Sequence, residues 1–252
     1  MAAKALGIIP ARWGSTRFPG KPLHEIAGQP LLRHVWERCT RASKLDAVII
    51  ATDDLRIAEA AFAWGAEVAL TSARLRSGTD RAAAVAAKAP AFEHIINIQG
   101  DEPLTNPRLI SRLVQQLQRD STLQMITAAH PFEDQADAQS PHQVKVVLDR
   151  QQRALYFSRR AIPFIREPTR GVRLLRHQGI YGYTRALLLQ FVQWKPSPLE
   201  RAESLEQLRA LENGVRMHVL VTTTGSPGVD TPADAAALEK ILARASQRTR
   251  RS

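Results

Sequence analysis

Short apolar runs alternate with amphipathic segments along the first hundred residues. Four compact apolar runs are typical of buried strands: residues 6–10, 46–51, 66–70 and 94–99. Three segments with apolar positions at helical spacing lie between them: residues 30–40, 57–64 and 77–88. This alternation predicts βαβ units, so we expect an α/β fold with a mainly parallel sheet and helices on both faces.

The pattern changes after about residue 123. Further strands are predicted at residues 125–129, 144–148, 154–157, 179–183 and 217–221. Helices are predicted over 197–213 and 232–245, and the segment of about 130–180 reads as an insertion between the sheet and the last helices. Because there is neither an internal repeat nor a long linker, we expect one domain over residues 1–252.

The polar loops after the predicted strands are the expected ligand-binding segments. In a parallel sheet, ligands bind at the carboxyl ends of the strands. The rule selects four segments, which are also polar and in part rich in glycine: residues 10–21, 52–54, 77–81 and 99–102.

Composition and charge narrow the classes of function. With 44% hydrophobic and 23% charged residues, the chain is expected to be globular rather than disordered. Lys and Arg number 35 against 24 Asp and Glu, a formal charge of +11 that suits an anionic partner. The basic residues are dispersed, apart from a short tail at 247–251, and no nucleic-acid-binding motif is present, so a small anionic substrate is favoured over nucleic acid.

The sequence contains no long apolar run and only one cysteine. No apolar run approaches the ~18 residues of a membrane-spanning helix, and the mean hydropathy is −0.24, so no membrane association is expected. Cys39 is the only cysteine, which excludes an intramolecular disulfide and a cysteine-based metal cluster. No secretory signal is visible at the start of the sequence, and a cytoplasmic location is therefore the default expectation.

The loop over residues 11–22 is the most informative stretch. It holds two Gly, Ser, Thr, two Arg and a Lys, a composition suited to wrapping a polyphosphate with backbone N–H groups and cations. It differs from a Walker A loop because five residues separate Gly14 from Gly20 and because Pro22 replaces the metal-binding Ser or Thr. From composition alone, a solvated basic loop is an equal alternative.

Eight motifs in order identify a family. The amino-terminal IIPARWGSTRFPGKPL, at residues 8–23, resembles the signature of the sugar-nucleotide-forming cytidylyltransferases. The other motifs lie at residues 77–81, 97–103, 144–149, 154–159, 176–183, 197–209 and 228–232. Together they resemble the 3-deoxy-manno-octulosonate (KDO) cytidylyltransferase family from residue 5 to about residue 242.

This resemblance implies a nucleotide-diphospho-sugar transferase-like fold with the 130–180 region as an inserted dimerisation arm. It implies transfer of CMP from CTP to KDO, giving CMP-KDO for lipopolysaccharide biosynthesis, with Mg²⁺ and a homodimer. The matching nucleotide-binding positions are Ala11, Arg12, Lys21, Thr52, Ser77, Gly78 and Gln99. The matching sugar-binding positions are Gln99, Arg159, His177, Tyr181, Glu206 and Gln207. Asp101 and Asp230 match the metal ligands, and with Arg12 and Lys21 they form the expected catalytic set.

Elementary chemistry agrees with several of these positions. His177 and Tyr181 are four apart in a predicted strand, so both can face one side and bind sugar hydroxyls. A guanidinium binds a carboxylate bidentately, and the family pattern favours Arg159 over Arg160 for this role. Glu206 and Gln207 could instead form a solvated helix face.

The two aspartates suggest a metal site. Adjacent carboxylates repel each other, and Mg²⁺ prefers oxygen ligands. The alternative is that Asp230 only caps the helix that begins near Pro232. No residue is an obvious nucleophile, so we expect direct displacement on the α-phosphorus without a covalent intermediate.

Three rival functions remain at this stage. Residues 54 and 80 are Asp where many members of the family have His and Glu, so fine details of the nucleotide or sugar pocket can differ. A branch of the family acts on an 8-amino form of the sugar, which stays open as the substrate. The motifs at 176–181 and 205–209 argue against a sialic acid. A non-catalytic protein that binds nucleotides or nucleic acid through its +11 charge is the alternative from another class.

Overall fold

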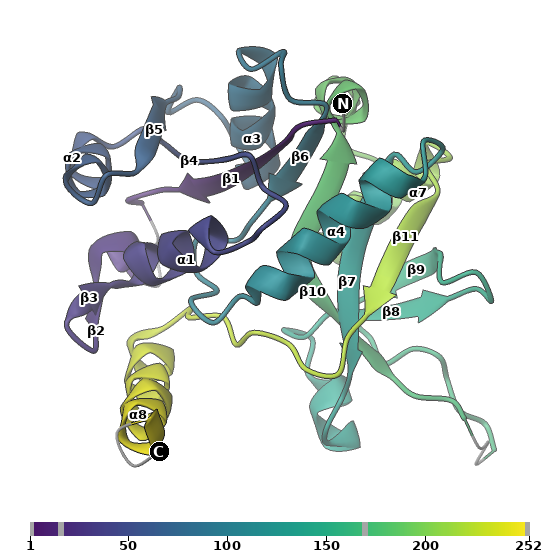
Figure 1. The fold of residues 1–252 in the computed structure, drawn as a ribbon. Coiled ribbons are helices and arrows are strands. Elements are labelled where there is room, and N and C mark those ends of the chain that lie inside the picture. Colours follow the sequence, from purple (N-terminus) through teal and green to yellow (C-terminus); the bar gives the residue numbers. More distant parts are fainter. Residues whose placement is uncertain (1–2, 15–17, 168–170, 250–252) are drawn as a thin grey trace. The chain divides into compact units, whose positions relative to one another are not determined.

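The computed structural model describes residues 3–14, 18–167 and 171–249 (Figure 1). The chain forms two compact units. Unit 1 consists of residues 1–4, 90–96 and 112–225, and unit 2 of residues 5–89, 97–111 and 226–252. The architecture is α/β with a mainly parallel sheet, as the alternation of strand and helix patterns predicts.

The strands of unit 2 are parallel. β1 (Ala5–Ala11) pairs with β4 (Ala47–Thr52), which pairs with β5 (Glu67–Leu70). The helices between them are α1 (Leu31–Thr40), α2 (Leu55–Ala63) and α3 (Gly78–Ala87). Two of these helices begin at side-chain caps: Asp54 accepts a hydrogen bond from the N–H of Arg56 at the start of α2, and Ser77 forms a capping box with Asp80 at the start of α3.

The last helix joins unit 2 through apolar packing. The loop after β1 leads to a short 3-10 helix, η1 (Lys21–Leu23), and a hairpin of β2 (Glu25–Ile26) and β3 (Gln29–Pro30). The closing helix α8 (Pro232–Thr249) packs there in one buried cluster: Phe18, Ile26, Leu31, Val229, Ala235 and Leu238. This cluster brings Asp230 beside the loop after β1, although the two are about two hundred residues apart in sequence.

Unit 1 is built around β7 (Met125–Pro131). β10 (Leu175–Thr184) pairs with β7 in antiparallel fashion, and β11 (Met217–Val221) pairs with its other side in parallel. β6 (His94–Asn97) lies next to β10. The hairpin of β8 (Lys145–Leu148) and β9 (Ala154–Ser158) attaches to the beginning of β10.

The helical segments of unit 1 are short apart from α4 (Pro107–Arg119), which continues from residues of unit 2. The others are η2 (Gln135–Gln139), α5 (Arg185–Phe191), α6 (Pro198–Glu203) and α7 (Gln207–Glu212). No helix among the described residues is long and apolar enough to cross a membrane.

The structure corrects the predicted helix over 197–213. It is two helices, α6 and α7, because Ser204 adopts the left-handed conformation (φ 51°, ψ 49°) and ends the first of them. The predicted strand 94–99 ends at Asn97. Helices α4 and α5 were not predicted, although buried residues of α4 such as Ile110, Leu113 and Leu117 recur at helical spacing.

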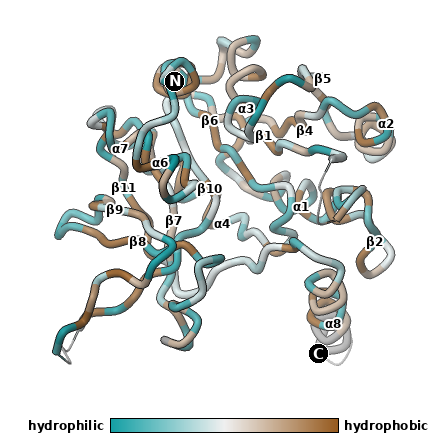
Figure 2. The backbone as a smooth tube through the Cα atoms, turned by 180° about the vertical axis from the view of Figure 1, so that it is seen from behind, coloured by the Kyte–Doolittle hydropathy of each residue, from teal (hydrophilic) through white to brown (hydrophobic). Residues whose placement is uncertain are grey.

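The segment that follows β9 extends away from the strands of unit 1 in both overall views (Figures 1 and 2). It exposes large apolar side chains, with Phe164 at 88% and both Ile165 and Val172 at more than two fifths. This segment belongs to the region that the sequence marks as an insertion.

Candidate active site in two parts

The strand ends of unit 2 line a cavity of about 410 Å³. Seven of the predicted site residues lie around it: Ala11, Arg12, Lys21, Gly78, Gln99, Asp101 and Asp230. They come from the end of β1, the loop behind it, the start of α3, the segment after β6 and the approach to α8. The strand-end rule therefore locates this part of the site. Residues 15–17, which belong to the same loop, lie outside the described residues.

Lys21 bridges the two predicted metal ligands. Its Nζ donates to Asp101 Oδ2 at 2.6 Å and to the carbonyl oxygen of Val229 at 2.9 Å, and it lies 3.5 Å from Asp230 Oδ1. The Lys21 side chain is only 15% exposed. Gly20 precedes it with φ 70°, a left-handed turn that glycine adopts without strain. The ammonium group thus faces both carboxylates at one edge of the cavity.

Reciprocal bonds between Thr231 and Asp234 hold the start of α8. Thr231 Oγ1 accepts the N–H of Asp234 at 3.3 Å, and Asp234 Oδ2 accepts the N–H of Thr231 at 2.8 Å. Asp230 contributes its own main-chain N–H to Asp234 Oδ2, while its side chain points to Lys21. Thr231 and Asp234 therefore bond reciprocally at the start of α8, while the Asp230 carboxylate lies against the Lys21 ammonium.

The donor set at Asp101 and Asp230 fits a hard divalent cation. Both carboxylates already face one cationic group, the ammonium of Lys21. Among the described residues there is no cluster of three or more His, Cys, Asp or Glu side chains that could enclose a metal ion. Mg²⁺ is commonly held by one or two carboxylates together with phosphate oxygens and water, so two aspartates suffice.

The basic loop is anchored at two further points. Arg12 Nη2 donates to the carbonyl oxygen of Leu75 at 2.7 Å. The guanidinium of Arg56 lies 3.5 Å above the ring of Trp13, and Asp54 holds Arg56 with bonds of 3.0 and 2.7 Å. The Asp54 carboxylate has a lowered pKa because Arg56 donates to it. Position 54 is one at which this chain differs from many members of the family. Its Asp orders the loop by holding Arg56 against Trp13.

Thr52 and Ser77 do not line this cavity. Thr52 is fully buried, and its Oγ1 accepts the N–H of Asp54 at 3.2 Å. Ser77 Oγ accepts the N–H of Asp80 at 3.0 Å within the capping box of α3. Their assignment as nucleotide-binding residues stays a prediction, and in this structure their hydroxyls support the local backbone.

Asn97 lines the cavity without having been predicted. It is almost fully buried; its Nδ2 lies 3.5 Å from Thr79 Oγ1, and its Oδ1 has no hydrogen-bond partner among the described residues. An unpartnered buried oxygen is costly, which favours contact with a bound molecule. Asn97 belongs to the motif at 97–103, but the sequence analysis placed it within the predicted buried strand over 94–99.

In unit 1, His177 and Tyr181 lie close together on β10. Their ring centroids are 5.3 Å apart, and a bulge between Gln178 and Tyr181 keeps both opposite β7. His177 Nε2 lies 3.0 Å from Thr127 Oγ1, and Phe157 packs edge-on against the imidazole. The expectation that the two side chains share a face is confirmed.

Both of these side chains are neutral at pH 7. Burial lowers the pKa of His177 to about 3. Burial raises the pKa of Tyr181 well above its usual value, and the charges of Tyr183 and Glu206 raise it further. Neutral imidazole and phenol groups can donate to and accept from hydroxyls without placing a charge in the interior.

Gln207 and Arg159, two other predicted sugar-binding residues of unit 1, differ in how far their donors are already used. Gln207 is 6% exposed, and its Nε2 has no partner among the described residues. The guanidinium of Arg159 gives three of its five N–H groups to the carbonyl oxygens of Glu203, Ser204 and Pro141. Two N–H groups, one on each terminal nitrogen, are left for a carboxylate.

Comparisons with known proteins identify the family of the chain. Residues 6–217 match the family described as cytidylyltransferase. The chain belongs to the cytidylyltransferase family. The 3-deoxy-manno-octulosonate cytidylyltransferase of Syntrophobacter fumaroxidans is 49% identical over 243 residues, covering 95% of this chain and 97% of that protein. The enzyme of the same name from Geobacter metallireducens is 46% identical over 254 residues, covering 97% and 98%.

A solved structure is similar over nearly the whole length. It is a CMP:2-keto-3-deoxy-manno-octonic acid synthetase complexed with CTP, with 41% sequence identity and a TM-score of 0.92. The similarity covers 96% of this chain and 99% of that one. The nucleotidyltransferase fold implied by the sequence motifs is thereby confirmed.

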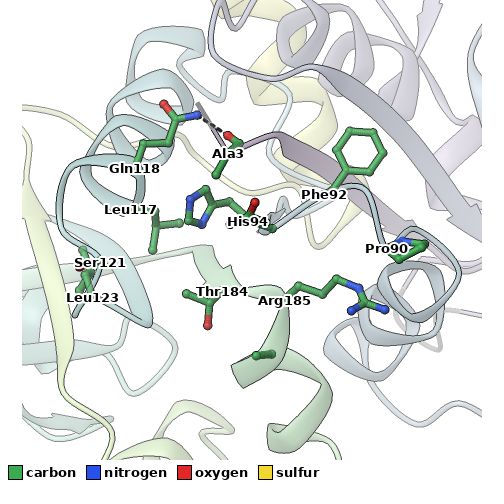
Figure 3. Close-up of a pocket in the computed structure, with 12 residues that line it drawn as sticks. Ala3, Pro90, Phe92, His94, Leu117, Gln118, Ser121, Leu123, Thr184 and Arg185 are labelled. Atoms are coloured by element: carbon green, nitrogen blue, oxygen red, sulfur yellow. Dashed lines mark hydrogen bonds between the residues drawn. The ribbon is translucent and has the colours of Figure 1, made fainter. Parts of the chain in front are cut away.

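A separate cavity of about 450 Å³ lies within unit 1 (Figure 3). Gln118 Nε2 donates to the carbonyl oxygen of Ala3 beside it at 2.7 Å. His94, the first residue of β6, and Thr184, the last of β10, line it, and none of the family's site positions does. It is at the amino end of β6, away from the strand ends that bind ligands in this fold, so we assign it no substrate.

Proposed function

We propose that this protein is a cytidylyltransferase that transfers CMP from CTP to KDO, giving CMP-KDO and pyrophosphate. The observation that carries the proposal is the Lys21 ammonium held by Asp101 and Asp230 in the cavity of unit 2. A cation and two carboxylates at parallel strand ends suit a metal-bound nucleoside triphosphate. The relatives' names supply the nucleotide and the sugar acid.

The reaction is a direct displacement. The anomeric hydroxyl oxygen of KDO forms a bond to the α-phosphorus, the bond from that phosphorus to the bridging oxygen breaks, and pyrophosphate leaves with the electron pair. Arg12 and Lys21 line the cavity as cations and offset the charge that develops on the leaving phosphates. Positioning and charge neutralisation are the main needs of such a transfer.

Asp101 and Asp230 would hold Mg²⁺. When bound, the ion supplies charge neutralisation at the phosphates and a lower pKa for the attacking hydroxyl. The chain's own contribution is the orientation of the two carboxylates by Lys21 and by the turn before α8. Asp230 is the more exposed of the two carboxylates.

His177, Tyr181 and Gln207 would bind the hydroxyls of the sugar acid. The first two are neutral and buried, and the third offers a buried amide donor. Glu206, whose charge acts on Tyr181, and Arg159, with two N–H groups left, would complete the recognition. Gln99 lines the cavity of unit 2, where it would contact ribose or sugar.

A pyrophosphate-release assay tests the function. The protein is mixed with CTP, KDO and Mg²⁺, and parallel reactions replace KDO by its 8-amino analogue or a sialic acid, or CTP by other nucleoside triphosphates. Release that requires both CTP and KDO supports the proposal. Release with the 8-amino sugar alone would identify that sugar, and not KDO, as the substrate. Absence of release together with salt-sensitive RNA binding would favour the non-catalytic alternative.

We also propose a homodimer that forms through the segment after β9. The exposed Phe164, Ile165 and Val172 give this segment an apolar surface of the kind that dimers cover. Phe164→Glu should convert the dimer to a monomer in analytical ultracentrifugation, whereas Phe62→Glu, at a position on α2 that is 76% exposed, should not. A wild-type monomer would contradict the proposal. The single-domain organisation, the cytoplasmic location and the role in lipopolysaccharide biosynthesis remain predictions.

A further inference from the structure

Lys145 is a charged residue in the interior of unit 1. It begins β8, its side chain is fully buried, and its Nζ donates to three main-chain carbonyl oxygens: Ser140 at 2.9 Å, Gln143 at 2.7 Å and Arg159 at 2.5 Å. Burial lowers its pKa, and the charge of Glu203 acts in the opposite direction. A buried ammonium is costly unless it is fully hydrogen-bonded, so this one must hold these three chain segments together.

Glu203 makes a second set of hydrogen bonds, which also includes Arg159. Its Oε1 accepts the hydroxyl of Ser158 at 2.7 Å, and its Oε2 accepts the N–H of Arg159 at 2.9 Å. Burial raises the pKa of this carboxyl, but the bonds from Arg159 and Ser158 outweigh it and leave the pKa lowered. The carboxylate therefore ties the end of β9 to the end of α6.

Arg159 bonds to both Lys145 and Glu203. Its guanidinium donates to the carbonyl oxygens of Glu203 at 2.7 Å and Ser204 at 3.2 Å, and on the other side to that of Pro141 at 3.0 Å. Its own carbonyl accepts from Lys145. We define Lys145, Arg159 and Glu203 as the turn clamp, because Lys145 and the Glu203 carboxylate both bond to the main chain of Arg159, whose guanidinium bonds to the turn between α6 and α7.

That turn needs to be held. Ser204 adopts a left-handed conformation that is strained for a residue other than glycine. Glu206 and Gln207 follow within three residues, so the backbone angles at Ser204 set the direction in which both side chains leave the turn. Hydrogen bonds from Arg159 to both carbonyls at the turn fix those angles.

We propose that Lys145 and Glu203 are positioning residues that, through Arg159, hold the α6–α7 turn so that Glu206 and Gln207 meet the sugar acid. This inference rests on the proposed function, because it takes the sugar acid as the molecule bound there. Neither Lys145 nor Glu203 is itself a sugar-contact residue in this assignment.

Glu203→Gln is the primary test. The amide places a donor or a weaker acceptor against the Ser158 hydroxyl and the Arg159 N–H, so one bond of the turn clamp is lost. We expect KM for KDO to rise about tenfold, the effect of one lost charge-assisted bond, with KM for CTP changed less than twofold. Lys145→Met should raise KM for KDO further, and Glu203→Asp should restore part of the loss.

Asp149→Asn is the matched control. Asp149 is a carboxylate at the β8–β9 hairpin that accepts bonds from the N–H groups of Gln151 and Arg153 and from the Arg153 guanidinium. It makes at least as many bonds as Glu203 but none to the α6–α7 turn. We expect its KM for KDO to equal that of the wild type. An equal rise in Asp149→Asn, or an unchanged KM for KDO in Glu203→Gln, would overturn the inference.

Amide hydrogen exchange separates this inference from the proposed function. A peptide covering residues 203–208 should exchange faster in Glu203→Gln than in the wild type or Asp149→Asn, whether or not the protein uses KDO. Failure of the wild type to release pyrophosphate with KDO would contradict the proposed function, and faster exchange would still establish the clamp on the turn. Unchanged exchange would refute the clamp even in a fully active enzyme.

Discussion

The two units differ in the charge of the groups that form their parts of the candidate site: charged groups in unit 2 and neutral groups in unit 1. In unit 2, the cavity is lined by cations and carboxylates on loops at strand ends, and Lys21 bridges Asp101 and Asp230. In unit 1, the central groups are His177 and Tyr181, both buried on β10 and both neutral at pH 7. Two charged residues of the same unit, Arg159 and Glu203, are engaged with each other and with backbone.

This difference corresponds to the two molecules that we propose to bind. A triphosphate carries several charges, and cations that line a cavity can neutralise it through charge-assisted hydrogen bonds. A sugar acid offers many hydroxyls, which neutral donors and acceptors in a fixed geometry can distinguish. Variants in unit 2 should therefore change the use of CTP, and variants in unit 1 the use of KDO.

The largest effect is expected at the paired carboxylates. Asp230→Asn should lose at least about a hundredfold in kcat, because a neutral amide is a poor ligand for Mg²⁺ and no longer balances Lys21. Its stability should be unchanged, since Thr231 and Asp234 form the cap. Pyrophosphate release over a range of Mg²⁺ concentrations measures the loss, with partial recovery expected at high Mg²⁺.

Thr231→Ala provides the opposite control. Loss of the cap should reduce the free energy of unfolding by about 1 kcal/mol while leaving kcat nearly intact, as urea unfolding and the same assay would establish. Wild-type turnover in Asp230→Asn, or a comparable loss of turnover in Thr231→Ala, would end the distinction between a capping and a metal-binding aspartate.

The next largest effect is expected at Lys21. Lys21→Ala removes a charge-assisted contact to phosphate and should lower kcat/KM for CTP about ten- to a hundredfold, with KM for KDO little changed. Lys44→Ala, an exposed lysine of the same unit, is the control. Equal losses in CTP and KDO parameters would mean that the two units do not divide the substrates as proposed.

Unit 2 was the more predictable of the two from sequence. Its parallel strands follow directly from compact apolar runs, and the strand-end rule alone selects the segments that carry Arg12, Lys21, Gly78 and Asp101. Asp230 could not be reached in this way. Its position depends on apolar packing of α8 against β2 and α1, a contact between distant parts of the chain.

Unit 1 was predictable mainly in its strands. The break between α6 and α7 was missed because Ser204 is not a residue that usually takes the left-handed conformation. Tertiary hydrogen bonds from Arg159 stabilise that conformation, and local sequence does not reveal them. The sugar-binding positions came from the family resemblance, since a buried His or Gln has no local signature that separates it from a core residue.

A smaller effect is expected at Tyr181. Tyr181→Phe keeps the ring and removes only the hydroxyl, so KM for KDO should rise about three- to tenfold, the effect of one neutral hydrogen bond, with KM for CTP unchanged. Tyr183→Phe is the control, because its ring stacks on Tyr181 at 6.0 Å but is not a predicted sugar contact. An altered KM for CTP in Tyr181→Phe would contradict the assignment of this hydroxyl to the sugar.

The smallest effect is expected on the pH dependence of the free energy of unfolding, and it arises from the neutral state of His177. The pKa of His177 is about 3 in the folded protein against 6.5 for an exposed histidine. Between these values the unfolded chain binds a proton that the folded chain does not, so the free energy of unfolding falls as the pH falls from about 6.5 towards 3. The stability due to neutral His177 is fully present above that window.

His177→Gln should remove this contribution. The slope of unfolding free energy against pH, measured by urea unfolding between pH 4 and 6, should decrease in the variant by up to about 1.4 kcal/mol per pH unit, the value for one proton. His94, His130 and His218 also have lowered pKa values through burial, so the wild-type slope is shared and only the difference is informative. His142→Gln, at an exposed position, is the control for the substitution itself. Equal slopes in the wild type and His177→Gln would mean that His177 is not held neutral by burial, and the contrast between a charged unit 2 site and a neutral unit 1 site would then fail at its central residue.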